Sequence, residues 1–219
     1  MVSPDKIIIA DDHPLFRQAL LATLTSQFTD ASWFEAQTID ELELLLTDNT
    51  DSDLVLLDLN IPGAHGFSTL IYVRKFFPQI PVVIISAHDN PETISKAMAY
   101  GAAGFVPKST PVDEIYSAIN AVLSGDTWLP AAFSLQPSPE ETVNIADRVA
   151  SLTQQQYRIL KMFAEGMLNK QIAYNLHVSE ATIKAHATAI FKKLNVRNRT
   201  QAVIAIAQLD LSESDLDYK

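Results

Sequence analysis

The stretch "KIIIADDHPLF", residues 6–16, joins an apolar run to two adjacent carboxylates. Three consecutive isoleucines are typical of a strand that is buried on both faces, because β-branched side chains suit a pleated surface. Asp11 and Asp12 follow at once. An ionised carboxylate beside a hydrophobic core is costly unless a cation or water compensates it. The rest of the sequence must therefore supply that compensation.

Apolar runs of this kind recur along the first half of the chain, and segments with helical periodicity separate them. Strand and helix alternate five times, which favours an α/β fold whose parallel sheet is covered on both faces. We therefore predict a doubly wound five-stranded parallel sheet, with polar residues gathered at the carboxyl ends of its strands. The predicted strands cover residues 7–10, 32–36, 54–57, 82–85 and 104–106.

The length of 219 residues suits two modest domains. We place the first domain at 1–125 and an interdomain linker at 126–147, because three prolines and many Ser and Thr residues interrupt the linker. The linker prolines are Pro130, Pro137 and Pro139.

From residue 152 onward the apolar spacing is purely helical and predicts four short helices. Gly166 fits a helix C-cap and Ser179 fits a helix N-cap. The second, all-α domain then spans 148–210, and the acidic end, 211–219, is expected to be disordered.

The net charge of −10 conceals two halves of opposite sign. Residues 1–126 hold 6 Lys and Arg against 17 Asp and Glu, a net −11, whereas residues 148–209 hold 9 against 2, a net +7. A basic second half favours nucleic-acid binding there, and the alternative is a charged face that is merely solvated.

The chain contains no cysteine, which excludes disulfides and thiolate metal sites. No apolar stretch approaches the roughly 18 residues of a membrane helix, and the first residues, MVSPDK, lack the pattern of a signal peptide. We expect a cytoplasmic protein that does not bind membranes.

A third carboxylate, Asp58, ends the third predicted strand in "LVLLDLNIPG". In the common strand order 2-1-3-4-5 the first and third strands are neighbours, so Asp58 should meet Asp11 and Asp12. Such a trio requires a cation, and an oxygen donor set favours Mg²⁺. Ser86 and Lys108 end the fourth and fifth strands. A carboxylate, a cation, a hydroxyl and an ammonium can together accept and hold a phosphoryl group.

At these positions residues 5–124 resemble the flavodoxin-like receiver domain of two-component response regulators, and the segment "DLNIPGAHG" adds to the likeness. The resemblance implies that Asp58 is the phosphoacceptor, that Ser86 and Lys108 bind the phosphoryl oxygens, and that Ser86 and Phe105 form the switch. It also implies a Mg²⁺ site made by Asp11, Asp12, Asp58 and the carbonyl of Asn60.

Each of these residues also has a plain structural reading. Asp11 or Asp12 alone fits an N-cap before Pro14, and Asp58 alone fits a turn before Pro62. His13 reads as an exposed loop residue and not as a catalytic base. The structural readings explain the residues singly but not the set.

Residues 152–209 resemble the LuxR-type DNA-binding domain, most clearly over its helix-turn-helix at about 169–194. Independently of that likeness, the apolar spacing of 183–194 buries one stripe and turns a polar, basic face outward, which fits a major groove. We expect Lys184, Ala185 and Thr188 to reach base edges. The expected phosphate contacts, with Lys192 on the same outward face, are Lys170, Lys193, Arg197 and Arg199.

Three residues depart from the LuxR-type pattern. Gln155 and Gln156 stand where the family usually has Arg and Glu, so a stabilising ion pair is expected to be missing. His177 occupies part of the turn between the two helices.

Together the two resemblances imply a transcriptional regulator that is not an enzyme. They imply phosphorylation of Asp58 by a sensor histidine kinase, and a homodimer bound to double-stranded DNA. One alternative is a constitutive DNA-binding regulator whose receiver site is idle. Another is a flavin module on the same sheet, but "DDHPLF" offers no phosphate-binding loop after the first strand.

Overall fold

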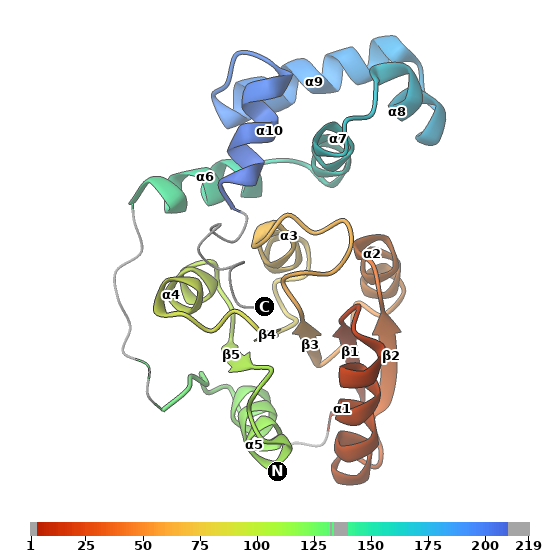
Figure 1. Ribbon diagram of the computed structural model, residues 1–219. Helices are drawn as coiled ribbons and strands as arrows, with labels where there is room; N and C mark the ends of the chain where they lie inside the picture. The colour runs from red at the N-terminus through yellow and green to blue at the C-terminus, as the bar shows by residue number, and fades with distance from the viewer. Residues whose placement is uncertain (1–3, 132, 134–139, 210–219) are drawn as a thin grey trace. The chain divides into compact units, whose positions relative to one another are not determined.

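The computed structural model describes residues 4–131, 133 and 140–209. These residues form two compact units that divide near residue 139. The first unit is an α/β domain and the second is entirely helical (Figure 1). The predicted disorder of 211–219 lies outside the described residues.

The first unit is built on a five-stranded parallel sheet, as the alternation of apolar runs predicts. Its strand order is β2-β1-β3-β4-β5, which confirms the expected doubly wound topology. Register brings Ala10 opposite Leu57, so that β1 and β3 end together. The strands are β1 (Lys6–Ala10), β2 (Ser32–Ala36), β3 (Leu54–Leu57), β4 (Val82–Ser86) and β5 (Gly104–Pro107).

Helices cover both faces of this sheet, which explains why the inner strands are apolar without alternation. Helices α1 (Pro14–Gln27) and α5 (Val112–Leu123) lie on one face. Helices α2 (Ile39–Asp48), α3 (Ser68–Phe76) and α4 (Pro91–Ala99) lie on the other (Figure 1). Buried side chains of α1 and α5 meet those of β1 and β3 in one continuous hydrophobic core.

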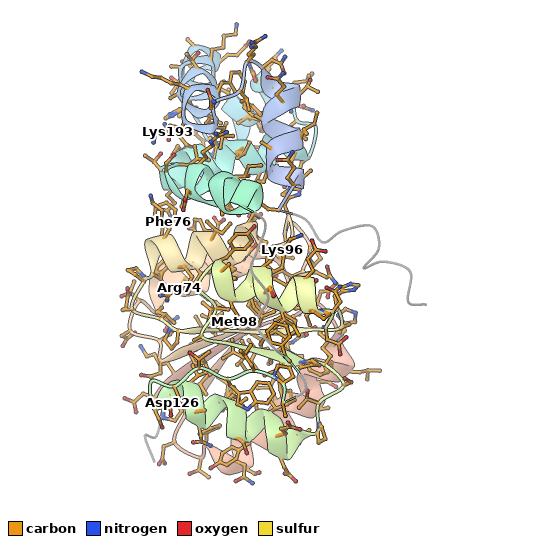
Figure 2. The ribbon with its side chains drawn as sticks, turned by 90° about the vertical axis from the view of Figure 1, so that its left-hand side faces the viewer. Arg74, Phe76, Lys96, Met98, Asp126 and Lys193 are labelled. Carbon is orange, nitrogen blue, oxygen red and sulfur yellow. The ribbon has the colours of Figure 1, made fainter. Side chains whose placement is uncertain are left out.

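The α/β unit continues past residue 125, where the sequence predicts the linker to begin. Asp126, labelled in Figure 2, follows α5. Trp128 then runs beside β5: its N–H donates to the Ala103 carbonyl at 3.2 Å, and its carbonyl accepts from Phe105 N at 3.1 Å. The first residues of the predicted linker therefore belong to the sheet domain.

The helical unit begins earlier than predicted. Helix α6 (Glu140–Ala150) starts inside the segment 126–147 that the prolines mark as a linker. The last of those prolines is Pro139, and Ala146 and Val149 of α6 are buried in the unit. The four predicted helices follow as α7 (Gln154–Ala164), α8 (Asn169–Asn175), α9 (Glu180–Leu194) and α10 (Arg199–Ala207).

Both predicted helix caps are confirmed. Gly166, just past the end of α7, has a φ of 80°, a left-handed conformation that glycine adopts at little cost. Ser179 Oγ accepts a hydrogen bond from Thr182 N at 3.1 Å at the start of α9. Within the described segments, no helix combines the length and the hydropathy that crossing a bilayer requires.

Candidate functional site

The carboxyl ends of β1 and β3 bring two buried carboxylates together. Asp11 directly follows β1 and Asp58 directly follows β3, and Asp58 N donates to the Ala10 carbonyl at 2.8 Å. The Asp11 and Asp58 residues are each 2% exposed. The structure thus places these two side chains as the strand order predicts.

Lys108, which follows β5, supplies a positive charge that compensates the carboxylates at the ends of β1 and β3. Its Nζ lies 2.8 Å from Asp11 Oδ2 and 2.7 Å from Asp58 Oδ2. Backbone pairing carries it there, because Lys108 N donates to the Ser86 carbonyl at 2.8 Å. One ammonium therefore bridges two buried carboxylates, and it leaves the pair with a net negative charge.

Burial is the main influence on the acidity of Asp58. Burial raises the pKa of Asp58, while the hydrogen bond and the charge of Lys108 act in the opposite direction and the charge of Asp11 reinforces the rise. The ionised form of Asp58 is therefore disfavoured until a further cation approaches.

His13 is an exposed loop residue, as the sequence predicts, and its ring lies beside this cluster. Its side chain is 61% exposed, but its Nδ1 lies 2.8 Å from Asp12 Oδ1 and 3.3 Å from Asp11 Oδ1. Nδ1 is also 3.7 Å from Asp58 Oδ2. The position of His13 in the sequence, directly between the acidic pair and Pro14 at the start of α1, could have indicated that its ring lies near the carboxylates.

The cluster fits a metal ion by its donor chemistry. Asp11, Asp12, His13 and Asp58 each offer one ligand atom, and these atoms lie within 4.8 Å of one another. Asp11 Oδ2 and Asp12 Oδ1 are buried and have no hydrogen-bond partner among the described residues. Three carboxylates suit a hard cation such as Mg²⁺. Asn60 stands beside them, since its N–H donates to Asp58 Oδ1 at 3.2 Å.

The two predicted switch residues are both fully buried. Ser86 is the last residue of β4, where its Oγ accepts from His88 N at 3.1 Å. Phe105 lies in β5 opposite Ile84. Ser86 thus lies at the end of its strand, as predicted, and Phe105 lies within its predicted strand, and the switching role remains a prediction.

Arg17 is a residue of this site that the sequence reasoning missed. Its guanidinium is buried, with Nη1 donating to the Asp11 carbonyl and Nε to Glu35 Oε2, each at 2.6 Å. Arg17 thereby ties α1 to β2 and holds the main chain at Asp11. Arg17 precedes Leu20 by three residues and Leu24 by seven, so all three lie on the buried face of α1. This helical spacing could have predicted from the sequence that Arg17 is buried.

The helical unit carries the predicted outward face on α9. Ile183, Ala187, Ile190 and Leu194 are buried. The residues expected to face DNA are exposed, namely Lys184, Ala185, Thr188, Lys192, Lys170 and Arg197. Lys184 Nζ makes an i,i+4 ion pair with Glu180 at 3.1 Å, and both side chains remain accessible.

Lys193, expected to contact a phosphate, makes hydrogen bonds within the helical unit, and its role toward DNA stays a prediction. Its Nζ donates to the Ser151 carbonyl and to Gln156 Oε1, each at 2.8 Å (Figure 2 labels Lys193). Gln156 is the residue that replaces the usual acid of the family. The ion pair that the sequence predicted to be missing is therefore replaced by a charge-assisted hydrogen bond between α9 and α7.

Arg199, also expected to contact a phosphate, makes contacts within the helical unit, and its role toward DNA stays a prediction. Its Nη2 donates to the Phe163 carbonyl at 3.0 Å, and its guanidinium lies 4.5 Å from the centre of the Phe163 ring. Burial lowers the pKa of Arg199. Arg199 thus packs α10 against α7.

Comparison with known proteins identifies both units. The family model described as the response regulator receiver domain matches residues 7–120. The model described as bacterial regulatory proteins of the luxR family matches residues 150–206.

Curated relatives match over both units together. The glycerol metabolism activator of Pseudomonas putida is 40% identical over 214 residues, covering 94% of this chain and 97% of the relative. The nitrate/nitrite response regulator protein NarL of Escherichia coli is 30% identical over 208 residues, covering 94% of this chain and 96% of the relative.

A solved structure of two RcsB dimers bound to two parallel DNAs shares the fold. Its TM-score is 0.55 at 22% identity, and the match covers 94% of this chain and 98% of that one.

Proposed function

This chain belongs to the two-component response regulators that join a receiver domain to a LuxR-type DNA-binding domain, and from that premise we propose that phosphorylation of Asp58 controls its binding to DNA. The chain is a DNA-binding regulator of transcription. The proposal adds the residues and the chemistry that link one unit to the other.

The contact of Lys108 with both Asp11 and Asp58 is the observation that carries the proposal. An exposed lysine often pairs with an acid, but this Nζ lies 2.7 Å from a carboxylate that is almost wholly buried at the end of a central strand. Burial of a charged pair is costly, so a cluster of this kind indicates function more strongly than it indicates stability.

In the proposed reaction an oxygen of Asp58 attacks the phosphorus of a phosphohistidine on a sensor kinase. A P–O bond forms as the P–N bond breaks, and the histidine leaves with the electron pair. Before the reaction, Asp58 Oδ2 accepts a hydrogen bond from Lys108 Nζ. Phosphorylation of either Asp58 oxygen forms an acyl phosphate and requires this hydrogen bond to rearrange. Lys108 then donates to a phosphoryl oxygen and neutralises part of its charge.

Asp11, Asp12, Asp58 and the carbonyl of Asn60 are the proposed holders of Mg²⁺. When bound, the ion neutralises charge on the carboxylates and on the incoming phosphoryl oxygens.

Ser86 and Phe105 are the proposed route from the phosphoryl group to the rest of the domain. Ser86 Oγ, which now accepts from His88 N, is to turn its hydroxyl hydrogen toward a phosphoryl oxygen. Phe105, fully buried, is to repack beside it and shift a pre-existing equilibrium between two states of the receiver.

The proposed output is altered dimerisation and DNA binding through α9. Lys184, Ala185 and Thr188 are the proposed base-edge contacts, and Lys170, Lys192 and Arg197 the proposed phosphate contacts. Two subunits on two half-sites gain avidity without any new contact within each domain. The RcsB complex, in which dimers are bound to DNA, is an example of that arrangement on a shared fold.

The deciding experiment is phosphorylation of an Asp58→Asn variant with a radiolabelled sensor kinase or acetyl phosphate in Mg²⁺. We expect the wild type to become radiolabelled and hydroxylamine to remove the label, because hydroxylamine cleaves acyl phosphates. The variant should not become labelled. Asp51→Asn is the matched control, because Asp51 is an exposed carboxylate whose ion pair is with Lys6. Equal labelling of wild type and Asp58→Asn refutes the assignment.

A further inference from the structure

Residues 127–129, called the strap from here on, run beside β5 and precede the helical unit in the chain. We propose that the strap is a releasable restraint, bound to β5 while Asp58 is unphosphorylated. Its detachment on phosphorylation then allows the protein to dimerise and to bind DNA more tightly. The inference rests on the proposed function, since it names the element through which the switch residue Phe105 acts.

The end of α5 directs the chain back along the sheet. Asp126 N donates to the Ala121 carbonyl at 2.9 Å. Gly125 N donates to the Val122 carbonyl at 3.0 Å. These two bonds form a Schellman motif, and Gly125 has the left-handed φ, 90°, that the motif requires. The chain therefore reverses direction after α5 and returns parallel to β5.

Two main-chain hydrogen bonds attach the strap to β5. Trp128 N donates to the Ala103 carbonyl at 3.2 Å, and Phe105 N donates to the Trp128 carbonyl at 3.1 Å. Because β5 is an edge strand, the outward N–H of Phe105 lies on the side that no further strand of the sheet covers. The strap is therefore bonded directly to the main chain of the predicted switch residue.

The hydrogen bond between Phe105 and Trp128 joins the two faces of the sheet. Val106 belongs to the core beneath α1 and α5, and the indole of Trp128 packs against that core. Because side chains alternate along a strand, the ring of Phe105 points to the opposite face, where α4 lies (Figure 1). A ring that repacks there tilts the Phe105 main chain and changes its hydrogen bond to Trp128. The strap thereby responds on one face to a change made on the other.

Gly104 shows how closely the strap lies on β5. A Cβ added at this residue would lie 3.2 Å from the Trp128 carbonyl oxygen and 3.5 Å from Trp128 Cβ. The first separation is shorter than an ordinary van der Waals contact, so the strap must shift outward if a side chain is present. Gly104→Ala therefore offers a way to loosen the strap without changing any residue of the phosphoryl site.

Few contacts hold the strap, as a releasable element requires. Trp128 and Leu129 are half-buried, and Thr127 is exposed. A main-chain hydrogen bond at a sheet edge contributes little net stability, because water competes for both of its groups. Segments of this kind lie at the low-stability end of a fold, where a change elsewhere readily shifts their population.

The test measures hydrogen exchange at the Phe105 amide of the full-length protein, together with binding to a two-half-site DNA fragment. In the wild type, acetyl phosphate and Mg²⁺ should raise the exchange rate of this amide by roughly tenfold, because its acceptor departs. Gly104→Ala and Trp128→Pro should raise it without any phosphodonor. The first crowds the Trp128 carbonyl, and the second removes the N–H that donates to Ala103. Both variants should then bind DNA about fivefold more tightly than the unphosphorylated wild type.

Thr127→Ala is the matched control, because the Thr127 side chain is exposed and both strap hydrogen bonds are made by the main chain of Trp128. It should behave as wild type. The two loosened variants change different segments, and thermal melts of each check that the receiver domain still unfolds cooperatively.

The proposal is wrong if the Phe105 amide exchanges faster in a folded variant while DNA binding and dimerisation stay at the level of the unphosphorylated wild type. It is also wrong if neither variant changes that exchange, or if the exchange is unchanged in wild-type protein whose Asp58 is shown to be labelled. The variant measurements need no phosphodonor, so they are independent of the Asp58→Asn labelling that decides the proposed function.

Discussion

At the scale of single residues, the direction of a charged side chain decides its role. Lys108 is turned into the acidic edge of the sheet, where it bridges Asp11 and Asp58. Lys192 and Lys193 are adjacent in sequence, yet the first is exposed and the second bonds to α7 and the preceding loop. Residue type alone does not separate these cases.

The raised pKa of Asp58 predicts that Asp58→Asn is more stable than the wild type without metal. Burial, the largest cause, disfavours the charge, so the folded state keeps a proton that the unfolded chain has released. The free energy of unfolding of the wild type therefore falls as the pH rises from 3.8, the ordinary pKa of the carboxyl, through its raised pKa in the folded state. The variant cannot ionise at this position, so its free energy of unfolding does not show this fall. Urea unfolding in EDTA should show a gain on the order of 1 kcal/mol at pH 7.

The same comparison at pH 4 is the internal control for this prediction. Lowering the pH toward the ordinary value of 3.8 increases the protonated fraction of Asp58 in both the folded and the unfolded state, so the gain from Asn should shrink. A variant that is less stable at pH 7, or a gain of equal size at both pH values, contradicts the account.

The adjacent pair Lys192 and Lys193 allows a matched prediction. Lys192→Ala should weaken DNA binding and lower the slope of log K against log salt by about 1, with an unchanged melting temperature. Lys193→Ala should instead destabilise the helical unit by about 1 kcal/mol, because Ser151 and Gln156 lose a charged donor. Binding titrations over a salt series and thermal melts of both variants measure the two effects, and exchanged outcomes refute the assignment.

At the scale of elements, helix ends are specified by short local signals. The turn from α8 to α9 closes with His177 N donating to the Tyr174 carbonyl and Val178 N to the Ala173 carbonyl. This is a Schellman motif, and it puts His177 at a φ of 52°. Gly166 fills the equivalent position after α7, where the sequence predicted a C-cap.

The left-handed backbone at His177 predicts that His177→Gly stabilises the helical unit. The left-handed conformation costs a residue with a Cβ about 1 kcal/mol. Glycine avoids this cost, but it loses more backbone entropy on folding, which cancels part of the gain. We expect a gain of roughly 0.5 kcal/mol in chemical denaturation. Asn195→Gly is the control, because Asn195 has a similar φ of 55° but is a residue that tolerates it, so its gain should be smaller. A loss of stability in His177→Gly would falsify the strain argument.

At the scale of the whole molecule, the chain joins an acidic receiver to a basic DNA-binding unit. The net charges of −11 over 1–126 and +7 over 148–209 keep the two surfaces chemically distinct. The proposed phosphorylation of Asp58 would add negative charge to the acidic unit alone, so we expect it to act on DNA binding through conformation or assembly.

The proposed coupling predicts a response that depends on Asp58. With Mg²⁺ and acetyl phosphate, wild-type protein should sediment increasingly as a dimer and bind a two-half-site DNA fragment more tightly. Asp58→Asn should respond in neither measurement. Dimerisation and DNA binding that are complete before the phosphodonor is added contradict this coupling and favour constitutive binding.

The sequence by itself determined the parallel sheet, its five strands and the residues at their carboxyl ends. Hydrophobic runs, their alternation with helical spacing, and the common strand order of doubly wound sheets together place Asp11, Asp58 and Lys108 at one edge. The buried stripe of α9 follows from spacing in the same way.

Only the tertiary structure decided which charged groups face inward and where the helical unit begins. His13 enters the acidic cluster, Arg17 anchors Asp11, and Lys193 bonds to Gln156, each through atoms far apart in sequence or set by side-chain direction. Helix α6 forms where its apolar face finds a packing partner. Periodicity reports which side of an element is buried, but the partner of a polar group is defined only once distant segments are packed together.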